Sequence, residues 1–553
     1  MERRLLRESL RRAPKAPWRG RFHLSLVLLA LVAATARAGA QIAPGLDLGG
    51  TVSTGGEAER YLRALQLVGV VPMRPWTIQE FTRADGATLA PRGAHPWSRR
   101  FAITDSTPRV AFLRPQARVV WNSAFPFQIG AGPTWAGRGV TGEVQAGVGA
   151  TFGRVDVQLA PVAFLAQNAS FPLAPNGQTG DQRFADARFP TSIDAPQRFG
   201  DKAYGRVDLG TSSLTVDLPR IAVGLSNAPQ RFGPARDYPL VLGPAAGGFP
   251  HAFIGTRESV DLWLLKAHAR VIMGRLSQTD FSPAAPNRSN RTATALVASI
   301  TPRGLDGLEL GGSRFFETHA PIALARLRRT LSGIIPQAAG AALNITDENQ
   351  IVSAFFRWAF PTAGFEVYGE LYREDYPGDL RRLIEKPDDL TDYTLGFQRT
   401  VLRGAGHMRV FRAEFVNGEL SPQERGQRGF DYPIPPYTHF ELVQGHTQHG
   451  LILGAADAFG GAGWRIGVDD FTPSGRRTIG IERALHFDQL PGQPVAYGDA
   501  HPDVLYGVRT EFTRFAGSRE YGVSLVPAYN INRNLEHGND RFNLSASASI
   551  RGW

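Results

Sequence analysis

The chain contains 553 residues, of which 61 are Gly, 39 are Pro and none is Cys. The absence of Cys excludes disulfides, thiolate metal sites, Cys nucleophiles and lipidation at an N-terminal Cys. The formal net charge is +11, but residues 1–40 hold nine Arg and Lys against two Glu, which leaves +4 for the rest. This modest charge argues against a dedicated nucleic-acid binder and allows contact with anionic polysaccharide or lipid head groups.

Residues 1–40 have the pattern of a secretory signal peptide. Arg-rich residues precede the apolar segment Leu24–Val32, and Ala38-Gly39-Ala40 then offers a cleavage site. The apolar segment is too short to cross a bilayer as a helix, although an N-terminal membrane anchor is the alternative. No later segment approaches an uninterrupted apolar run of about twenty residues. We therefore predict a secreted chain that is cleaved near Ala40.

Residues 41–96 are predicted to form a small helical module. Apolar residues fall on one face of Glu57–Val68, which predicts a helix. Thr77–Glu80 has the pattern of a capping box, with Trp76 and Phe81 placed as a hydrophobic staple, so a second helix is expected there. Two short helices cannot bury a core alone, so the module needs a larger body. A general helix-turn-helix is the alternative, but the lack of a basic recognition helix argues against DNA binding.

Residues 97–553 change to an alternation with a period of two, which is typical of β-strands. The clearest alternating segments are Val140–Phe152, Val155–Asn168, Phe365–Tyr372, Tyr506–Phe515, Tyr521–Tyr529 and Phe542–Ile550. Segments of about ten residues with alternating polarity, separated by turns, are what a transmembrane β-barrel requires. The sheet has to close, because lipid offers no partner to an unpaired backbone amide.

The fold class that follows is mainly β: a closed antiparallel transmembrane β-barrel. The pattern marks roughly fourteen to eighteen strands. A soluble β-propeller or sandwich is the alternative, but no regular blade-length repeat supports a propeller. The chain ends on Trp553, and a terminal aromatic residue after an amphipathic strand resembles the signal that the outer-membrane assembly machinery reads.

The stretch Ile221–Gly255 combines strand-like segments with closely spaced Gly and Pro residues. The apolar segment Ile221–Leu225 is followed by residues that break regular structure, then by a second apolar segment, Leu240–Leu242, and by a third strand-like run from Ala252. Gly and Pro set this closely do not form a plain hairpin. We therefore expect a folded insertion between two strands.

Three pieces of this insertion carry a resemblance to a known family: Arg231-Phe232-Gly233-Pro234-Ala235, Pro239-Leu240-Val241-Leu242 and Gly248-Phe249-Pro250-His251. Together with the N-terminal helical module and the segments Asn349–Phe397 and Tyr437–Gly454, they resemble the bacterial capsule-assembly Wzi family of outer-membrane barrels.

The resemblance implies a barrel of about 18 strands, with the N-terminal helices as a plug at its periplasmic end. It also implies a monomeric, lectin-like protein of the outer membrane that helps to assemble or anchor capsular polysaccharide or exopolysaccharide without covalent chemistry. The expected partners are that polysaccharide, outer-membrane lipid and the assembly machinery. A passive porin for small solutes is the alternative, because it would share the barrel, the signal and the terminal aromatic residue.

A ladder of polar side chains follows one predicted strand: Glu366, Tyr368, Glu370 and Tyr372. Residues two apart on a strand share one face. Carboxylates are unfavourable against lipid, so this face is expected to line the lumen. The resemblance extends to this ladder, because the family carries a similar Glu-x-Tyr-x-Glu strand.

Three interpretations of the ladder stay open. It pairs with Arg residues of neighbouring strands such as Arg357, Arg399 or Arg412; it binds sugar hydroxyls, with aromatic faces against sugar rings; or Glu366 and Glu370 form a glycosidase pair. The candidate polysaccharide-binding or lumen-lining residues are Arg231, Phe232, Gly233, Pro234, Phe249, His251, Arg357, Trp358, Glu366, Tyr368, Glu370, Tyr372 and Asp375.

His446 and His449 do not favour a metal site, because their spacing would place them on opposite faces of a strand. The sequence has no G-x-S-x-G elbow and no Walker-type phosphate loop. We therefore expect no enzyme activity, no cofactor and no metal.

Overall fold

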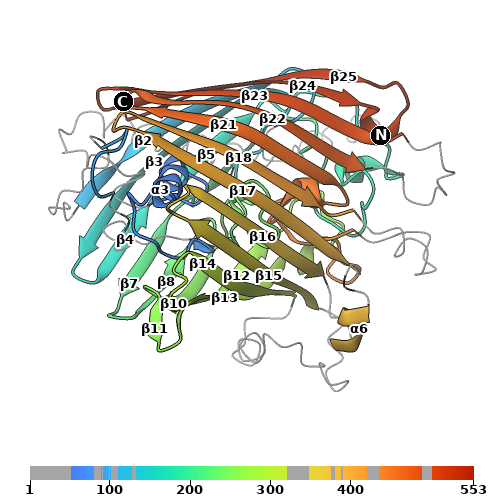
Figure 1. Ribbon diagram of the computed structural model, residues 1–553. Coiled ribbons are helices and arrows are strands. Elements are labelled where there is room, and N and C mark those ends of the chain that lie inside the picture. Colours follow the sequence, from blue (N-terminus) through green and yellow to red (C-terminus); the bar gives the residue numbers. More distant parts are fainter. Residues whose placement is uncertain are drawn as a thin grey trace, which may run out of the picture. The chain divides into compact units, whose positions relative to one another are not determined.

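The computed structural model describes residues 52–79, 89, 91–98, 100, 110–127, 132–319, 348–374, 380–385, 387, 390–419, 435–487 and 501–552. The predicted signal peptide, Glu80, Phe81, the candidate Asp375 and the terminal Trp553 lie outside these described residues. Within them the fold is mainly β, and most strands belong to one closed antiparallel barrel (Figure 1). The predicted fold class is therefore confirmed.

The barrel wall contains 21 strands. β2 pairs with β25 as well as with β3, which closes the sheet. Three strands of the wall are interrupted, so each of them appears as two shorter strands among the 21. These pairs are β4 with β5, β6 with β7, and β10 with β11. Counted this way, the barrel is 18-stranded, which agrees with the number that the resemblance implies.

The first half of the wall consists of β2 (Val110–Asn122), β3 (Gly139–Phe152), β4 (Val155–Leu159), β5 (Val162–Ala166), β6 (Tyr204–Asp208), β7 (Ser213–Asp217), β8 (Ile221–Ser226), β10 (His251–Thr256), β11 (Val260–Leu262), β12 (Leu265–Ser277) and β13 (Asn290–Pro302). The second half consists of β14 (Leu308–Thr318), β15 (Glu348–Phe360), β16 (Phe365–Glu374), β17 (Thr391–Arg403), β18 (His407–Asn417), β21 (Ala462–Thr472), β22 (Gly475–Phe487), β23 (Asp503–Ala516), β24 (Arg519–Ile531) and β25 (Arg541–Arg551).

Short turns join the strands at one end of the barrel, and long connections join them at the other. Gly153-Arg154 links β3 to β4, and Gly517-Ser518 links β23 to β24, at what we call the short-turn end. Residues 167–203, 227–250 and 435–461 belong to connections at the opposite, long-loop end. β25 finishes at the short-turn end, where the C-terminus is marked in Figure 1. Transmembrane barrels have this same asymmetry.

The outer surface of the barrel carries apolar side chains on many strands. Trp121 on β2, Leu165 on β5, Leu371 on β16, Phe411 on β18 and Ile481 on β22 are all exposed. Successive side chains of a strand point to opposite faces, so polar neighbours of these residues face the lumen. None of the helices in the described part of the chain is long and apolar enough to cross a membrane.

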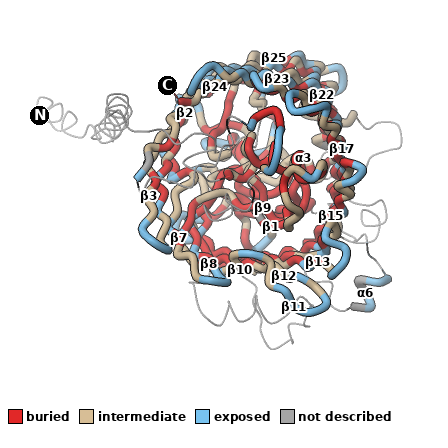
Figure 2. The backbone as a smooth tube through the Cα atoms, turned by 60° about the vertical axis from the view of Figure 1, so that its left-hand side comes forward, coloured by how far each residue is buried: buried red, intermediate tan, exposed pale blue. Residues whose placement is uncertain are grey.

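The lumen is filled by the N-terminal segment and by two long connections. α3 (Glu57–Gln66) lies inside the ring of strands, together with β1 (Ile78–Gln79) and β9 (Arg231–Phe232), which pair with each other (Figure 2). We call residues 52–79 the plug segment and residues 227–250, which contain β9, the inserted loop. Residues 435–461 add the small hairpin β19 (Thr447–Gln448) and β20 (Leu451–Ile452).

The remaining short elements are α6 (Leu380–Glu385) and the 3₁₀ helices η2 (Gly180–Phe184), η3 (Pro244–Ala246), η4 (Pro286–Arg288), η5 (Ala456–Ala458) and η6 (Arg533–Leu535).

The prediction of a folded insertion within Ile221–Gly255 is confirmed, because the inserted loop connects β8 to β10, which pair with each other.

α3 forms where the periodicity predicts a helix, and its apolar face is completely buried. Tyr61, Leu62 and Leu65 belong to one core cluster with Trp97 and with Phe471 of β21. The rings of Tyr61 and Trp97 stack with their centroids 4.2 Å apart. Phe471 is next to the short turn between β21 and β22, so the helix packs at the short-turn end. This packing supplies the larger body that a short helix requires.

The predicted second helix at Thr77–Glu80 is wrong over its described residues. Ile78 and Gln79 form β1, whose partners are Phe232 and Arg231 of β9. The Thr77 hydroxyl, which a capping box needs as an acceptor, is buried without a hydrogen-bond partner among the described residues. A helix cap contributes about 1 kcal/mol, and pairing with a distant buried strand outweighs this local preference.

Candidate functional site

Glu366 lies at the contact between α3 and the barrel wall. Its carboxylate accepts hydrogen bonds from Arg63 Nε on α3 at 2.8 Å and from Arg357 Nε on β15 at 2.6 Å. Arg357 also donates to Glu309 Oε1 at 2.6 Å and to Gln66 Oε1 at 2.8 Å. The four charged side chains are each at most 2% exposed. A charge buried this deeply is stable only with its partners in place, so the cluster fastens α3 to the wall.

Arg231 and Pro234 connect the inserted loop to the same helix. Arg231 Nη1 lies 2.6 Å from Glu59 Oε1, and both side chains are buried. Burial opposes ionisation of Glu59, but the nearby guanidinium groups of Arg231 and Arg63 hold the pKa of its carboxyl below the usual value. The carbonyl of Pro234 accepts a hydrogen bond from Arg63 Nη1 at 2.7 Å, and Phe232 is fully buried. These candidate residues therefore contact the plug segment.

Tyr368 and Glu370 of the ladder form hydrogen bonds with β18 and with the inserted loop, respectively. The Tyr368 hydroxyl donates to Glu414 Oε2 at 2.7 Å, and Glu370 Oε2 accepts the backbone amide of Leu240 at 3.1 Å. Gly233 comes close to the same carboxylate: a Cβ atom there would lie 3.0 Å from Glu370 Oε2. Its φ of +85° also lies in the left-handed region, so this position of the inserted loop suits glycine alone.

Of the remaining candidates, Trp358 alone faces away from the lumen. Tyr372 is buried and donates to Glu374 Oε2 at 3.0 Å, and His251 donates from Nδ1 to the carbonyl of the buried Phe249 at 2.8 Å. Trp358 is 42% exposed on the outer surface, because it directly follows an inward-facing residue of β15. The prediction that Trp358 lines the lumen is therefore wrong.

The arginines proposed as partners of the ladder separate into three cases. Arg357 pairs with Glu366, as described above. Arg399 is exposed on β17, on the outward-facing set of residues. Arg412 faces the lumen but pairs with Asp237 of the inserted loop at 3.0 Å rather than with the ladder. Arg399 and Arg412 are therefore not the partners that the first interpretation expected.

A cavity of about 500 Å³ remains between the plug segment and the opposite wall. It extends from Gly55 beside α3 to Arg551 at the end of β25, and we call it the turn-end cavity. Its charged lining residues are Arg60, Arg118, Arg412, Arg465, Arg509, Arg551, Glu143, Asp237, Glu482 and Glu511. Arginines outnumber carboxylates in this list, so the lining carries an excess of positive charge.

A second cavity of about 280 Å³ lies toward the long loops, and we call it the loop-end cavity. Phe125, Phe127 and Phe171 contribute aromatic surface to it. His486, Asp503 and Arg533 are among its polar lining residues. Neither cavity is enclosed.

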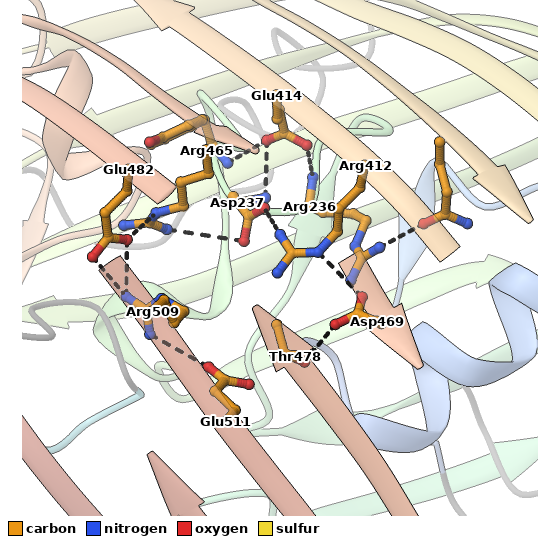
Figure 3. A network of polar contacts seen from close by, with 12 residues as sticks. Arg236, Asp237, Arg412, Glu414, Arg465, Asp469, Thr478, Glu482, Arg509 and Glu511 are labelled. Carbon is orange, nitrogen blue, oxygen red and sulfur yellow. Dashed lines mark hydrogen bonds and ion pairs between the residues drawn. The ribbon is translucent and has the colours of Figure 1, made fainter. Parts of the chain in front are cut away.

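Three charged residues line both cavities, and we call them the constriction: Arg465, Glu482 and Arg509. They belong to one network of polar contacts (Figure 3). Glu482 Oε2 lies 3.1 Å from Arg465 Nε and 3.0 Å from Arg509 Nη2. Arg465 Nη1 also lies 3.9 Å from Asp237 of the inserted loop. Burial opposes ionisation of Asp237, but Arg412 and Arg465 hold the pKa of its carboxyl well below the usual range. The constriction is thus an ordered network of alternating charges.

The carboxylates of the ladder are not among the residues that line the two cavities. Glu366 and Glu370 line neither cavity and are covered by α3 and the inserted loop. The geometry therefore gives no support to a glycosidase pair, because neither of these two cavities reaches the buried carboxylates.

Sequence reasoning missed the constriction, although its signal is of the same kind as that of the ladder. On β21, Arg465 precedes the exposed Ile466, and on β22 the exposed Ile481 precedes Glu482. The period-two alternation identifies Arg465 and Glu482 as inward-facing. It does not reveal which inward-facing residues stay uncovered, because that depends on where the inserted segments pack.

His446 anchors the 435–461 connection inside the barrel. It is fully buried, with Nε2 donating to the Val241 carbonyl at 2.7 Å and Nδ1 in contact with the Glu317 carboxylate. Arg291 Nη1 lies 2.6 Å from the same carboxylate. Within the described ranges, no group of three or more His, Asp or Glu side chains is placed to hold a metal ion.

The fold and the lumen together define the class: a closed antiparallel barrel with an apolar exterior and a charged, largely filled interior. No family model matches the chain, and no curated protein matches it in sequence. Among solved structures, the chain is similar to Wzi of Escherichia coli, described as an outer-membrane protein involved in group 1 capsule assembly and as a carbohydrate-binding β-barrel. The likeness covers 91% of this chain and 99% of that chain, with 15% identity and a TM-score of 0.62. The predicted resemblance is confirmed at the level of the fold.

Two further solved structures are OccK5 of Pseudomonas aeruginosa and OccAB4 of Acinetobacter baumannii. Each is 10% identical to this chain and covers 80% of it and 98% of its own length, with TM-scores of 0.36 and 0.37 respectively.

Proposed function

We propose that this protein is an outer-membrane, carbohydrate-binding barrel that helps to assemble or anchor capsular polysaccharide or exopolysaccharide at the cell surface. The observation that carries the proposal is the 18-stranded barrel filled by α3 and the inserted loop, a fold shared with the carbohydrate-binding Wzi barrel. Binding is non-covalent, and no enzyme activity, cofactor or metal is part of the proposal.

The proposed location is supported by the surface chemistry of the barrel. Exposed apolar side chains such as Trp121 and Phe411 suit a lipid environment, and the charged lumen is shielded from it. The long loops would then face outward, and the short turns and α3 would face the periplasm. We propose that the chain reaches this location as a monomer, after signal cleavage near Ala40 and insertion by the outer-membrane assembly machinery. Besides the polysaccharide and the assembly machinery, outer-membrane lipid is the third proposed partner.

The test of the proposed function is polysaccharide retention. The gene is deleted, and cell-bound polysaccharide is compared with polysaccharide shed into the medium. We expect total synthesis to be unchanged while the cell-bound fraction falls, and re-expression of the full chain to restore it. Unchanged retention in the deletion strain would contradict the proposal.

A passive porin is the second candidate, and one observation favours it. The turn-end and loop-end cavities follow the same side of the lumen and meet at the constriction, so a partial solute path lies beside the plug segment. Planar-bilayer conductance of the full chain distinguishes the two functions, because a plugged barrel conducts poorly. We expect low conductance that rises several-fold when residues 41–96 are deleted. High conductance of the full chain, with unchanged retention in the deletion strain, would favour the porin.

A further inference from the structure

The loop-end cavity has the composition of a small-molecule site. Its volume of about 280 Å³ is close to the lower end of the roughly 300–1,000 Å³ typical of ligand pockets. Phe125 and Phe171 are buried beside the barrel strands in one apolar cluster, against which the half-buried Phe127 packs. The cavity lies at the long-loop end, since Phe125 follows β2 and Arg533 follows β24. It thus offers an aromatic surface next to polar groups.

The carboxylates that line this cavity already have partners within the protein. Glu482 is bound by the two arginines of the constriction, and Asp457 lies 3.6 Å from one of them, Arg465. Asp503 Oδ1 contacts His486 Nδ1 at 3.1 Å and accepts a hydrogen bond from Asn530 at 2.8 Å. Glu482 and Asp457 are therefore paired with arginine and Asp503 is held by hydrogen bonds, so all three are poor candidates for binding a cation.

Arg533 lines only the loop-end cavity and differs from the two arginines of the constriction. Its guanidinium lies over the Phe125 ring, 4.0 Å from the centroid. Over the described ranges, no carboxylate lies within ion-pair distance of this guanidinium, and its side chain is half-buried at the cavity. The aromatic ring holds the cation in place, while its N–H donors remain for a ligand. A guanidinium binds a carboxylate through two parallel hydrogen bonds.

We propose that the loop-end cavity binds one acidic sugar unit of a surface polysaccharide, a unit whose ring carries a carboxylate. The carboxylate pairs with Arg533, and the apolar face of the sugar ring packs on Phe127. The size of the cavity limits binding to a single unit or a chain end, so the rest of the polysaccharide extends past the long loops. This inference rests on the proposed function and names its ligand class and its site.

The experiment measures binding of oligosaccharide fragments from the producing cells' own surface polysaccharide to the purified full-length barrel by calorimetry. Half of the fragments are first treated with carbodiimide and borohydride, which reduces each carboxylate to an alcohol. We expect Arg533→Gln to weaken binding of the untreated fragments roughly 10- to 100-fold, the range for loss of a charged hydrogen bond. We expect the reduced fragments to bind wild type and Arg533→Gln equally weakly.

Arg541→Gln is the matched control. Arg541 is exposed and close enough to act electrostatically on Arg533, but it does not line the cavity. The variant removes the same charge from the same end of the barrel, and we expect its affinity to stay within about twofold of wild type. Equal losses in the two arginine variants, or equal binding of untreated and reduced fragments by wild type, would overturn the assignment.

Phe127→Leu tests the aromatic surface with little risk to folding, because it keeps an apolar side chain at a half-buried position. We expect it to weaken binding of untreated and reduced fragments by a similar factor, unlike Arg533→Gln.

The retention assay distinguishes failure of the proposed site from failure of the proposed function. If gene deletion lowers retention but Arg533→Gln does not, the site is wrong and the anchoring function stands; if deletion has no effect, the anchoring function itself fails.

Discussion

Two sides of the same lumen use arginine and glutamate in different ways. On the side of β14–β16, Arg357 and Glu366 are covered by α3 and are fully buried. On the side of β21–β23, Arg465 and Glu482 form a similar ion pair at 3.1 Å, but Arg465 is 29% exposed and both residues line cavities. Similar residue pairs therefore fasten the plug on one side and line open cavities on the other.

The difference shows that the role of a charged residue in the lumen depends on whether another segment covers it, rather than on its residue type. Water screens a charged pair beside a cavity, so such a pair contributes little to stability and can exchange partners with a ligand. A pair sealed beneath α3 has no water to replace a lost partner, and breaking it is strongly destabilising. The following predictions test this contrast, from the largest expected effect to the smallest.

Glu366→Gln should have the largest effect on stability. The substitution leaves Arg63 and Arg357 buried without their shared carboxylate, which costs about 3–5 kcal/mol. The measurement is the free energy of unfolding in urea, with bilayer conductance as a second readout of plug release. Asp261→Asn is the control, because its pair with Arg303 is about 60% exposed and contributes under about 1 kcal/mol. Equal effects of the two variants would contradict the contrast.

Acidification should loosen the plug side through His95. Burial lowers the pKa of His95 to about 4, and its Nδ1 lies 2.8 Å from the Tyr61 hydroxyl of α3. The unfolded chain has the higher pKa, near 6.5, so it gains the proton first. The stability present above pH 6.5 is then lost as the pH falls through 4, by up to roughly 3 kcal/mol.

Hydrogen exchange of α3 at pH 7.5 and pH 5 measures this loss. We expect faster relative opening of α3 at pH 5 in wild type and a reduced pH dependence in His95→Gln, with residues 501–552 as the internal reference. An identical pH response of α3 in both proteins would show that another group is responsible.

Arg509→Gln should have a small effect on stability. Arg509 contacts Glu482 at 3.0 Å and Glu511 at 3.4 Å, and its side chain is 19% exposed at the constriction. Because the cavities admit water, we expect a loss of about 1 kcal/mol in the free energy of unfolding. A loss as large as that of Glu366→Gln would mean that this side of the lumen is as dry as the plug side.

Trp358→Leu should have the smallest effect. Trp358 lies on the outer surface and lines neither of the two cavities. We expect a change within about 0.5 kcal/mol and unchanged retention of polysaccharide. A marked loss of retention without a loss of stability would return Trp358 to the candidate binding residues.

The sequence by itself determined the wall of the barrel and the helix. A period of two identified β3, β16, β23, β24 and β25, and it placed Glu366 and Tyr368 on the inward face. A period of 3.6 identified α3. These patterns identify the elements because they are local. Each one records only which face of a single strand or helix meets apolar surroundings and which face meets polar surroundings.

The tertiary structure alone decided which inward-facing residues are sealed. Glu366 is covered because Arg63, 303 positions earlier in the chain, reaches it from α3, and Glu59 meets Arg231 from a loop 172 positions away. The same long-range packing turned the capping pattern at Thr77 into a strand. Local periodicity carries no information about such partners, because the position of a loop or helix in the lumen is fixed by contacts between segments far apart in the sequence.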